Sequence, residues 1–90
     1  MARHLSALKR ARQNEKRRLR NQSRKTRVKN VVRQVRQAVA QKNPEAAQAA
    51  LQSAIPTIAR VASKGTLHWR AAARKISRLT RQVNALSTPA

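Results

Sequence analysis

A long stretch without proline or glycine, from Ala7 to Gln41, limits what this protein can fold into more than any other feature. Arginine, lysine, glutamine, leucine and alanine, all good helix formers, dominate it. Ser6 precedes it as a candidate N-cap, because a serine hydroxyl can accept a hydrogen bond from an early helical N–H group. At about 1.5 Å rise per residue, a helix over residues 6–41 would be about 50 Å long. The rest of a short chain cannot cover all of it.

This expected helix changes character near Arg27. Before Arg27 it has no useful apolar face, because Glu15 and many cations surround the positions of Leu8 and Leu19. Like charges four residues apart destabilise an isolated helix by roughly a few tenths of a kcal/mol for each pair. We therefore expect this half to be frayed alone and ordered when phosphate groups neutralise it. After Arg27 the apolar residues follow the spacing of a buried helical face: Val28, Val31, Val32, Val35, Ala38 and Val39.

A second helix, about residues 44–62, is predicted to fold back against the first, because the break between them is short. At this break Asn43 suits the N-cap, Pro44 the first helical position and Glu45 the positive end of the helix dipole. Pro56 lies within the second helix and removes one backbone hydrogen bond, so we expect a kink or a local break there. The expected inner face consists of Ala47, Ala50, Leu51, Ala54, Ile55, Ile58, Val61 and Ala62.

A third helix, about residues 66–86, follows a turn in which Gly65 suits the left-handed conformation and Thr66 is a candidate N-cap. We expect frayed ends at residues 1–5 and 87–90. The prediction is an all-α, three-helix antiparallel bundle, a single domain over residues 1–90, with the basic half of the first helix projecting beyond it. The inner face of the third helix is expected to contain Ala72, Ala73, Ile76, Leu79, Val83 and Leu86.

The charge of the chain indicates its class of partner. The formal net charge is +20, from 22 lysines and arginines against two glutamates. A chain this basic repels itself, and a polyanion is its natural partner. Arginines outnumber lysines, which favours bidentate contacts with phosphate groups.

The residue inventory argues against catalysis and against a metal or other cofactor. Glu15 and Glu45 are far apart in the sequence, so they do not indicate an acid–base pair. Without aspartate or cysteine, neither a Ser-His-Asp nor a Cys-His arrangement is available. His4 and His68 have no carboxylate or thiolate neighbours to complete a metal site. We therefore predict that the protein is not an enzyme and uses no cofactor.

The hydropathy pattern predicts no membrane segment, since no apolar run approaches the roughly 20 residues that a spanning helix needs. A secretory signal is not expected either, because Leu5 and Leu8 are followed at once by cations. An organelle transit peptide shares the arginine-rich composition, but here the basic bias continues as far as Arg81.

Trp69 is the only aromatic residue apart from the histidines, and two roles are open for it. It closes one end of the small core, which is the commoner role, or it stacks on a base or sugar. With no second aromatic, recognition is expected to depend on backbone shape and charge. The chain lacks a heptad dimerisation seam and a compact helix-turn-helix, so RNA is favoured over DNA, and an obligate homo-oligomer is not expected. A nucleoid-type DNA-binding protein and a membrane-active cationic peptide are the alternatives.

Three segments resemble a known family. They are HLSALKRARQNEKRRLRNQSRKT at residues 4–26, PEAA at 44–47 and KGTLHWRAAARKISRL at 64–79. They are similar to the bacterial small-subunit ribosomal protein S-twenty, and the similarity spans nearly the whole chain. Trp69 and Arg70 depart from the Lys-Asn pair that follows the histidine in that family.

The resemblance implies a three-helix bundle that binds directly to 16S ribosomal RNA in the small ribosomal subunit and helps its assembly. It implies a cytoplasmic, ribosome-bound protein without a membrane or small-molecule partner. On matching positions, it implies RNA contacts by Lys9, Arg10, Lys16, Arg17, Arg18, Arg20, Asn21, Lys64, His68 and Arg74. Further basic residues expected at the RNA interface are Arg12, Arg24, Lys25, Arg27, Arg70, Lys75 and Arg78.

Overall fold

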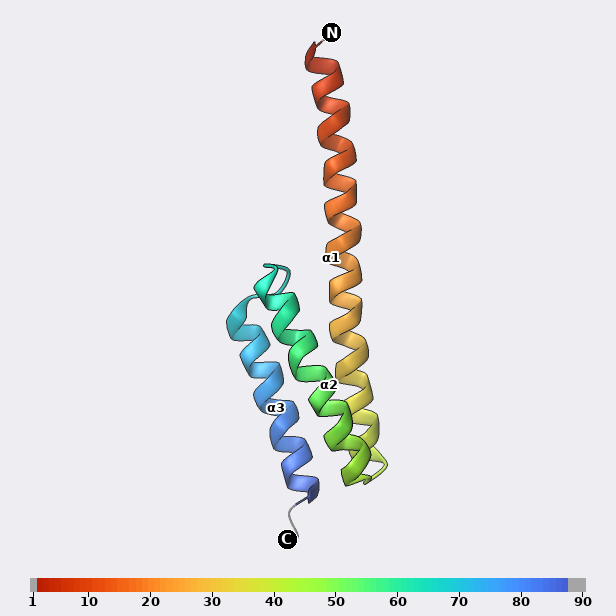
Figure 1. The fold of residues 1–90 in the computed structure, drawn as a ribbon, viewed down its shortest axis with the longest axis vertical. Coiled ribbons are helices and arrows are strands. Elements are labelled where there is room, and N and C mark those ends of the chain that lie inside the picture. The colour runs from red at the N-terminus through yellow and green to blue at the C-terminus, as the bar shows by residue number, and fades with distance from the viewer. Residues whose placement is uncertain (1, 88–90) are drawn as a thin grey trace.

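The structure, a computed structural model, describes the backbone of residues 2–87 and the side chains of residues 5–86. Within these limits the chain forms three helices, α1 (Ala2–Ala40), α2 (Pro44–Ser63) and α3 (Trp69–Ser87), and no strand. Helix α2 runs antiparallel to the C-terminal half of α1, and α3 turns back along α2 (Figure 1). The N-terminal half of α1 projects beyond both, so the molecule measures 70 × 22 × 14 Å. The predicted all-α bundle with a projecting first helix is confirmed.

A small aliphatic core joins the three helices. Val35, Ile58 and Val83, one from each helix, are completely buried. Burying a side chain of this size contributes about 1.5–3 kcal/mol. No buried polar or charged side chain occurs within residues 5–86. The buried residues are Val28, Val35, Ala38, Ala47, Leu51, Ala54, Ile58, Val61, Ala72, Leu79 and Val83.

Two details of the core differ from the predicted faces. Ala73, expected on the inner face of α3, is exposed, because Ala72 occupies the position that faces the core. Leu67, which lies in the turn before α3, packs against the core from outside any helix. A helical periodicity argument does not apply to a turn residue, so the sequence pattern missed Leu67.

The start of α1 also differs from the prediction. The helix begins at Ala2, so Ser6 lies within it and is not its N-cap. Nothing between Ala2 and Leu5 interrupts a helix, because the segment contains no proline or glycine. Of the expected frayed ends, Met1 and residues 88–90 lie outside the described backbone, whereas Ser87 is the last residue of α3.

The turn between α1 and α2 closes α1 with a Schellman arrangement of hydrogen bonds. The Lys42 N–H donates to the Val39 carbonyl at 3.0 Å, and the Asn43 N–H donates to the Ala38 carbonyl at 3.2 Å. Lys42 has a φ of 56°, the left-handed conformation that glycine usually supplies at this position. Asn43 then caps α2 as predicted, since its side chain accepts the Ala46 N–H at 3.1 Å.

Helix α2 continues through Pro56, so the predicted local break does not occur. Pro56 and Gln52 are both exposed residues, and the proline removes the helical hydrogen bond to the Gln52 carbonyl. The buried Ala54 and Ile58 hold the helix against the core on both sides of the proline. Packing of the apolar face therefore outweighs the loss of one backbone hydrogen bond.

The turn between α2 and α3 uses Gly65 as predicted, with a φ of 81°. Thr66, however, is not the N-cap of α3, which begins three residues later at Trp69. His68 has that role: its Nδ1 accepts the Arg70 N–H at 3.1 Å, and its carbonyl accepts the Ala72 N–H at 3.0 Å. The hydroxyl of Thr66 is directed to α1 instead.

Candidate nucleic-acid interface

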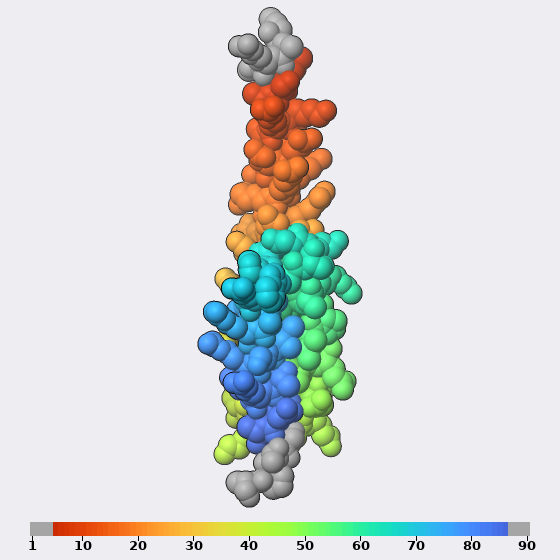
Figure 2. All heavy atoms as spheres, turned by 90° about the vertical axis from the view of Figure 1, so that its left-hand side faces the viewer, coloured from red at the N-terminus to blue at the C-terminus, as the bar shows by residue number. Residues whose placement is uncertain are grey.

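The projecting part of α1, residues 5–23, is called here the arm. Every side chain of the arm is exposed, including Leu8 at 48% and Leu19 at 52%. Figure 2 shows the arm as a slender column of side chains that extends beyond the other two helices. At 3.6 residues per turn its cations point in all directions around the helix. Seven predicted RNA-binding cations lie on it: Lys9, Arg10, Arg12, Lys16, Arg17, Arg18 and Arg20.

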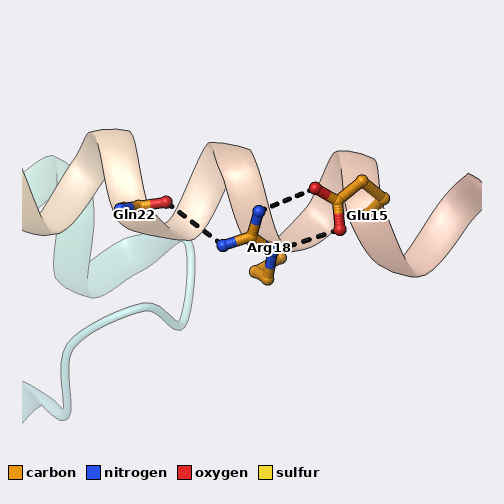
Figure 3. A network of polar contacts seen from close by, with 3 residues as sticks. All are labelled: Glu15, Arg18 and Gln22. Atoms are coloured by element: carbon orange, nitrogen blue, oxygen red, sulfur yellow. Dashed lines mark hydrogen bonds and ion pairs between the residues drawn. The ribbon is translucent and has the colours of Figure 1, made fainter.

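One acidic side chain interrupts this positive surface. Arg18 donates from Nη2 to Glu15 Oε1 at 2.7 Å and from Nε to Glu15 Oε2 at 3.1 Å (Figure 3). A third, longer bond runs from Arg18 Nη1 to Gln22 Oε1 at 3.5 Å. The hydrogen bonds and charge of Arg18 lower the pKa of Glu15, and Glu15 raises the pKa of Arg18. Arg18 is thus partly neutralised. Arg17 and Arg20 lie at other angles around the helix than Arg18.

The base of the arm is tied to the α2–α3 turn by a polar contact. Thr66 Oγ1 donates to Asn21 Oδ1 at 3.1 Å and accepts from Arg24 Nη1 at 3.3 Å. Arg24 is half-buried as a result. Two predicted RNA-binding residues, Asn21 and Arg24, therefore have an intramolecular partner that joins segments more than forty positions apart in the chain.

The α2–α3 turn places four predicted or candidate residues together at the top of the bundle. Lys64, His68 and Arg70 are exposed. Trp69 is 65% exposed, so of the two roles left open for it, closing one end of the core does not apply. It lies instead against its sequence neighbours, with the His68 ring centroid at 5.8 Å and Arg70 Cζ at 5.2 Å from the indole. Trp69 is the first residue of α3, and side chains tilt toward the N-terminal end of a helix, so its exposure places it beyond the end of the core that begins with Ala72.

A second basic surface lies between α1 and α3, which touch each other less than either touches α2. Two adjoining hollows of about 500 and 330 Å³ share Val32, Arg36 and Lys75 in their walls. We call them together the α1–α3 groove. Arg74 and Arg78, both predicted RNA-binding residues, line it from α3 with Lys75. Its basic lining consists of Lys29, Arg33, Arg36, Arg74, Lys75 and Arg78.

Sequence reasoning did not include Lys29, Arg33 and Arg36 among the RNA-binding residues. The available signal was their spacing, since residues 29, 33 and 36 follow one another at helical intervals beside the valine face. Of the other predicted residues, Lys25 lies with Thr66 and Leu67 at a hollow of about 220 Å³, and Arg27 is exposed on α1.

No cluster of three or more potential metal ligands occurs among the described residues. The Nδ1 of His68 accepts a hydrogen bond from the Arg70 N–H at the start of α3. The side chain of His4 lies outside the described part of the chain. None of the described helices is long and apolar enough to cross a membrane.

Comparison with known proteins places this architecture in a family. The model of the family described as "Ribosomal protein S20" matches residues 2–84. The chain belongs to the ribosomal protein S20 family. The small ribosomal subunit protein bS20 of Syntrophus aciditrophicus is 54% identical over 85 residues, which cover 94% of this chain and 96% of the relative. Its counterpart in Trichlorobacter lovleyi is 52% identical over 86 residues, 96% of this chain and 99% of the relative.

A third S20 relative, the small ribosomal subunit protein bS20 of Syntrophobacter fumaroxidans, is 52% identical and is covered completely, with 96% of this chain aligned. The family resemblance identified from the sequence is thereby confirmed. The family match over residues 2–84 includes the arm, the α2–α3 turn and the α1–α3 groove, so all three candidate surfaces lie within the matched residues.

Proposed function

We propose that this protein is a structural constituent of the small ribosomal subunit that binds directly to 16S ribosomal RNA and helps it to fold and assemble. It acts without catalysis or a cofactor, as a ribosome-bound cytoplasmic protein that needs no second copy of itself. The single observation that best supports this is the arm, a helix exposed on all sides whose charges are positive apart from Glu15. Membership in the ribosomal protein S20 family supports the choice of ribosomal RNA.

The mechanism follows from the charges of the arm. An isolated helix with cations on every face is unstable, and bound phosphates remove the repulsion. Folded RNA brings several phosphate backbones close together, so it can surround a slender positive helix on more than one side. The α1–α3 groove offers a second positive surface, which lies farther along α1 than the arm. Binding at both surfaces would hold two stretches of RNA in a fixed relation, which is how a protein without catalytic groups assists RNA folding.

The test measures the affinity of the full chain for a 16S ribosomal RNA transcript over a range of salt concentrations. Each neutralised phosphate should contribute about −0.7 to −0.9 to the slope of log K against log salt. Arg17→Ala combined with Arg18→Ala should reduce this slope by up to about 2 while leaving the thermal melt nearly unchanged. Val35→Asp is the matched control, because it places a charge in the core and should lower the melt first.

Competition distinguishes the proposed function from the alternatives. Duplex DNA of equal nucleotide content should displace the 16S transcript poorly. A nucleoid-type role would instead give preferential binding to DNA. Affinity that does not change with salt would contradict the electrostatic mechanism, and the protein should cofractionate with small ribosomal subunits at high salt.

A further inference from the structure

We propose that Trp69 is a stacking site for one unpaired base of the bound RNA, placed where the arm meets the bundle. This inference rests on the proposed function but adds a contact that charge alone does not provide. Trp69 and Arg70 also replace the Lys-Asn pair that follows the histidine in the family, so the proposed site is a feature of this chain's own sequence.

The exposure of Trp69 is the first observation. An indole that is 65% exposed contributes little to the fold, and it is the largest apolar side chain at the surface of the bundle. Its neighbours lie at ordinary distances for a stacked pair and a cation–π contact, with the His68 ring centroid at 5.8 Å and Arg70 Cζ at 5.2 Å, and they leave Trp69 65% exposed. The ring therefore keeps most of its surface available to a planar partner.

The rigidity of the backbone around Trp69 is the second observation. The hydrogen bond from the Arg70 N–H to His68 Nδ1 and the bond from the Ala72 N–H to the His68 carbonyl hold the first turn of α3. Gly65 and the contact of Thr66 with Asn21 hold the turn before it. A stacking site on a fixed backbone loses less conformational entropy on binding than one on a free loop.

The position of Trp69 supplies the third observation and the choice of ligand. The Thr66–Asn21 bond places the α2–α3 turn beside the base of the arm, as Figure 1 shows. An RNA strand that neutralises the arm therefore passes near Trp69, and its phosphates can meet Lys64, which is exposed on the turn, and Arg70, which is exposed at the start of α3. Aromatic stacking next to cations is the usual way of holding an unpaired base, and it tolerates any base. With one aromatic ring, the site takes one base and does not read a sequence.

Fluorescence tests this directly, because Trp69 is the only tryptophan and the chain has no tyrosine or phenylalanine. The full chain is titrated with the 16S transcript at low salt while binding is followed independently by filter retention. We expect Trp69 emission to be quenched in step with binding. A fully paired RNA duplex, which also attracts the arm, should bind without comparable quenching.

Substitutions test how much Trp69 contributes to the affinity for RNA. Trp69→Ala should weaken binding of the 16S transcript about tenfold. Its salt slope should not change, because no phosphate contact is lost, and its thermal melt should be close to that of the parent protein. Trp69→Phe should keep most of the affinity. Arg81→Ala removes an exposed charge from the same helix and is the control, which should leave the quenching of Trp69 unchanged.

Three outcomes would contradict the stacking site, and they differ in what they imply for the proposed function. RNA binding with an unchanged emission, or with equal affinity for Trp69→Ala, would overturn the stacking site and leave the proposed function intact. Loss of all RNA binding by the parent protein would overturn both. A blue shift with vesicles of anionic phospholipid, together with no response to RNA, would show that Trp69 is a membrane contact and overturn the inference.

Discussion

Thr66 and Asn21 are joined by a side-chain hydrogen bond of 3.1 Å that fixes the α2–α3 turn to the base of the arm. The same threonine oxygen accepts a hydrogen bond from Arg24, so one hydroxyl connects two successive turns of α1. The contact lies at the point where α1 ceases to be covered by protein. It therefore sets the position of the turn relative to the arm.

Thr66→Val should loosen this connection. The change removes the hydroxyl, which costs about 0.5–1.5 kcal/mol for each net hydrogen bond, and it leaves Arg24 half-buried without this partner. For a domain of this size each kcal/mol lowers the melting temperature by roughly 4–8 °C. Thermal unfolding followed by circular dichroism measures the effect. Thr66→Ser keeps the hydroxyl and should melt close to the parent protein, and a drop for Ser equal to that for Val would contradict the role of the hydroxyl.

Lys42→Gly should stabilise the protein. Lys42 adopts a φ of 56° to complete the Schellman turn, and a side chain with a Cβ atom in that conformation costs about 1 kcal/mol or more relative to glycine. Urea denaturation should show a higher midpoint with an unchanged slope. Lys42→Ala is the control for the loss of charge, since alanine retains the Cβ atom. If alanine stabilised as much as glycine, relief of charge repulsion and not backbone strain would be responsible.

Acidification should reduce the helix content of the arm through Glu15. Because Arg18 lowers the pKa of Glu15 in the folded helix, the ion pair stabilises the helix above the ordinary glutamate pKa. This contribution is lost as the pH falls through the lowered value. The helical circular dichroism signal should decline over that acidic range. In Glu15→Gln the decline should be absent or smaller, because no carboxylate remains there to titrate.

The same substitution should tighten RNA binding. Glu15→Gln releases Arg18 from its acidic partner and removes the one negative charge on the arm. The affinity for the 16S transcript at neutral pH should rise by on the order of a few-fold, and the salt slope should become steeper. Glu45→Gln is the matched control, since Glu45 lies at the opposite end of the bundle in the first turn of α2. Equal effects of both changes would indicate a response to net charge alone.

Neutralising the α1–α3 groove should separate stability from binding. Arg36→Gln with Arg74→Gln removes two positive charges that line one hollow, so repulsion between α1 and α3 decreases. The melting temperature should stay the same or rise, while the affinity for the 16S transcript should fall and its salt slope should decrease by up to about 2. A matched pair of exposed charges away from the groove, Lys42→Gln with Arg60→Gln, should have a smaller effect on affinity. A lower affinity accompanied by a lower melting temperature would point to a structural role instead.

Much of the fold follows from local sequence signals. The valine face after Arg27, the Asn43-Pro44 cap and Gly65 predict three helices and their order, because each depends on neighbours within one or two helical turns. The projecting arm is also predictable, since a helix with charges on every side has no apolar face to bury.

Contacts between distant segments were not predictable in this way. Thr66 reads as a helix cap from its neighbours, and only the approach of the turn to α1 gives its hydroxyl a better partner in Asn21. His68 then takes the cap of α3, and Trp69 is exposed because, as the first residue of α3, it lies beyond the end of the core. Each of these outcomes depends on the residue at which α3 begins, which local sequence signals define only to within a residue or two.

The sequence by itself therefore determined that this chain forms a basic helical bundle with an uncovered first helix, because helix formation and charge are local properties. It also determined the family, through motifs that extend over most of the chain. The tertiary structure alone decided which cations gather in the α1–α3 groove and which polar side chains join the turn to the arm. The physical reason is that packing of a few aliphatic side chains, Val35, Ile58 and Val83 among them, sets the orientation of each helix and thereby the position of every surface residue.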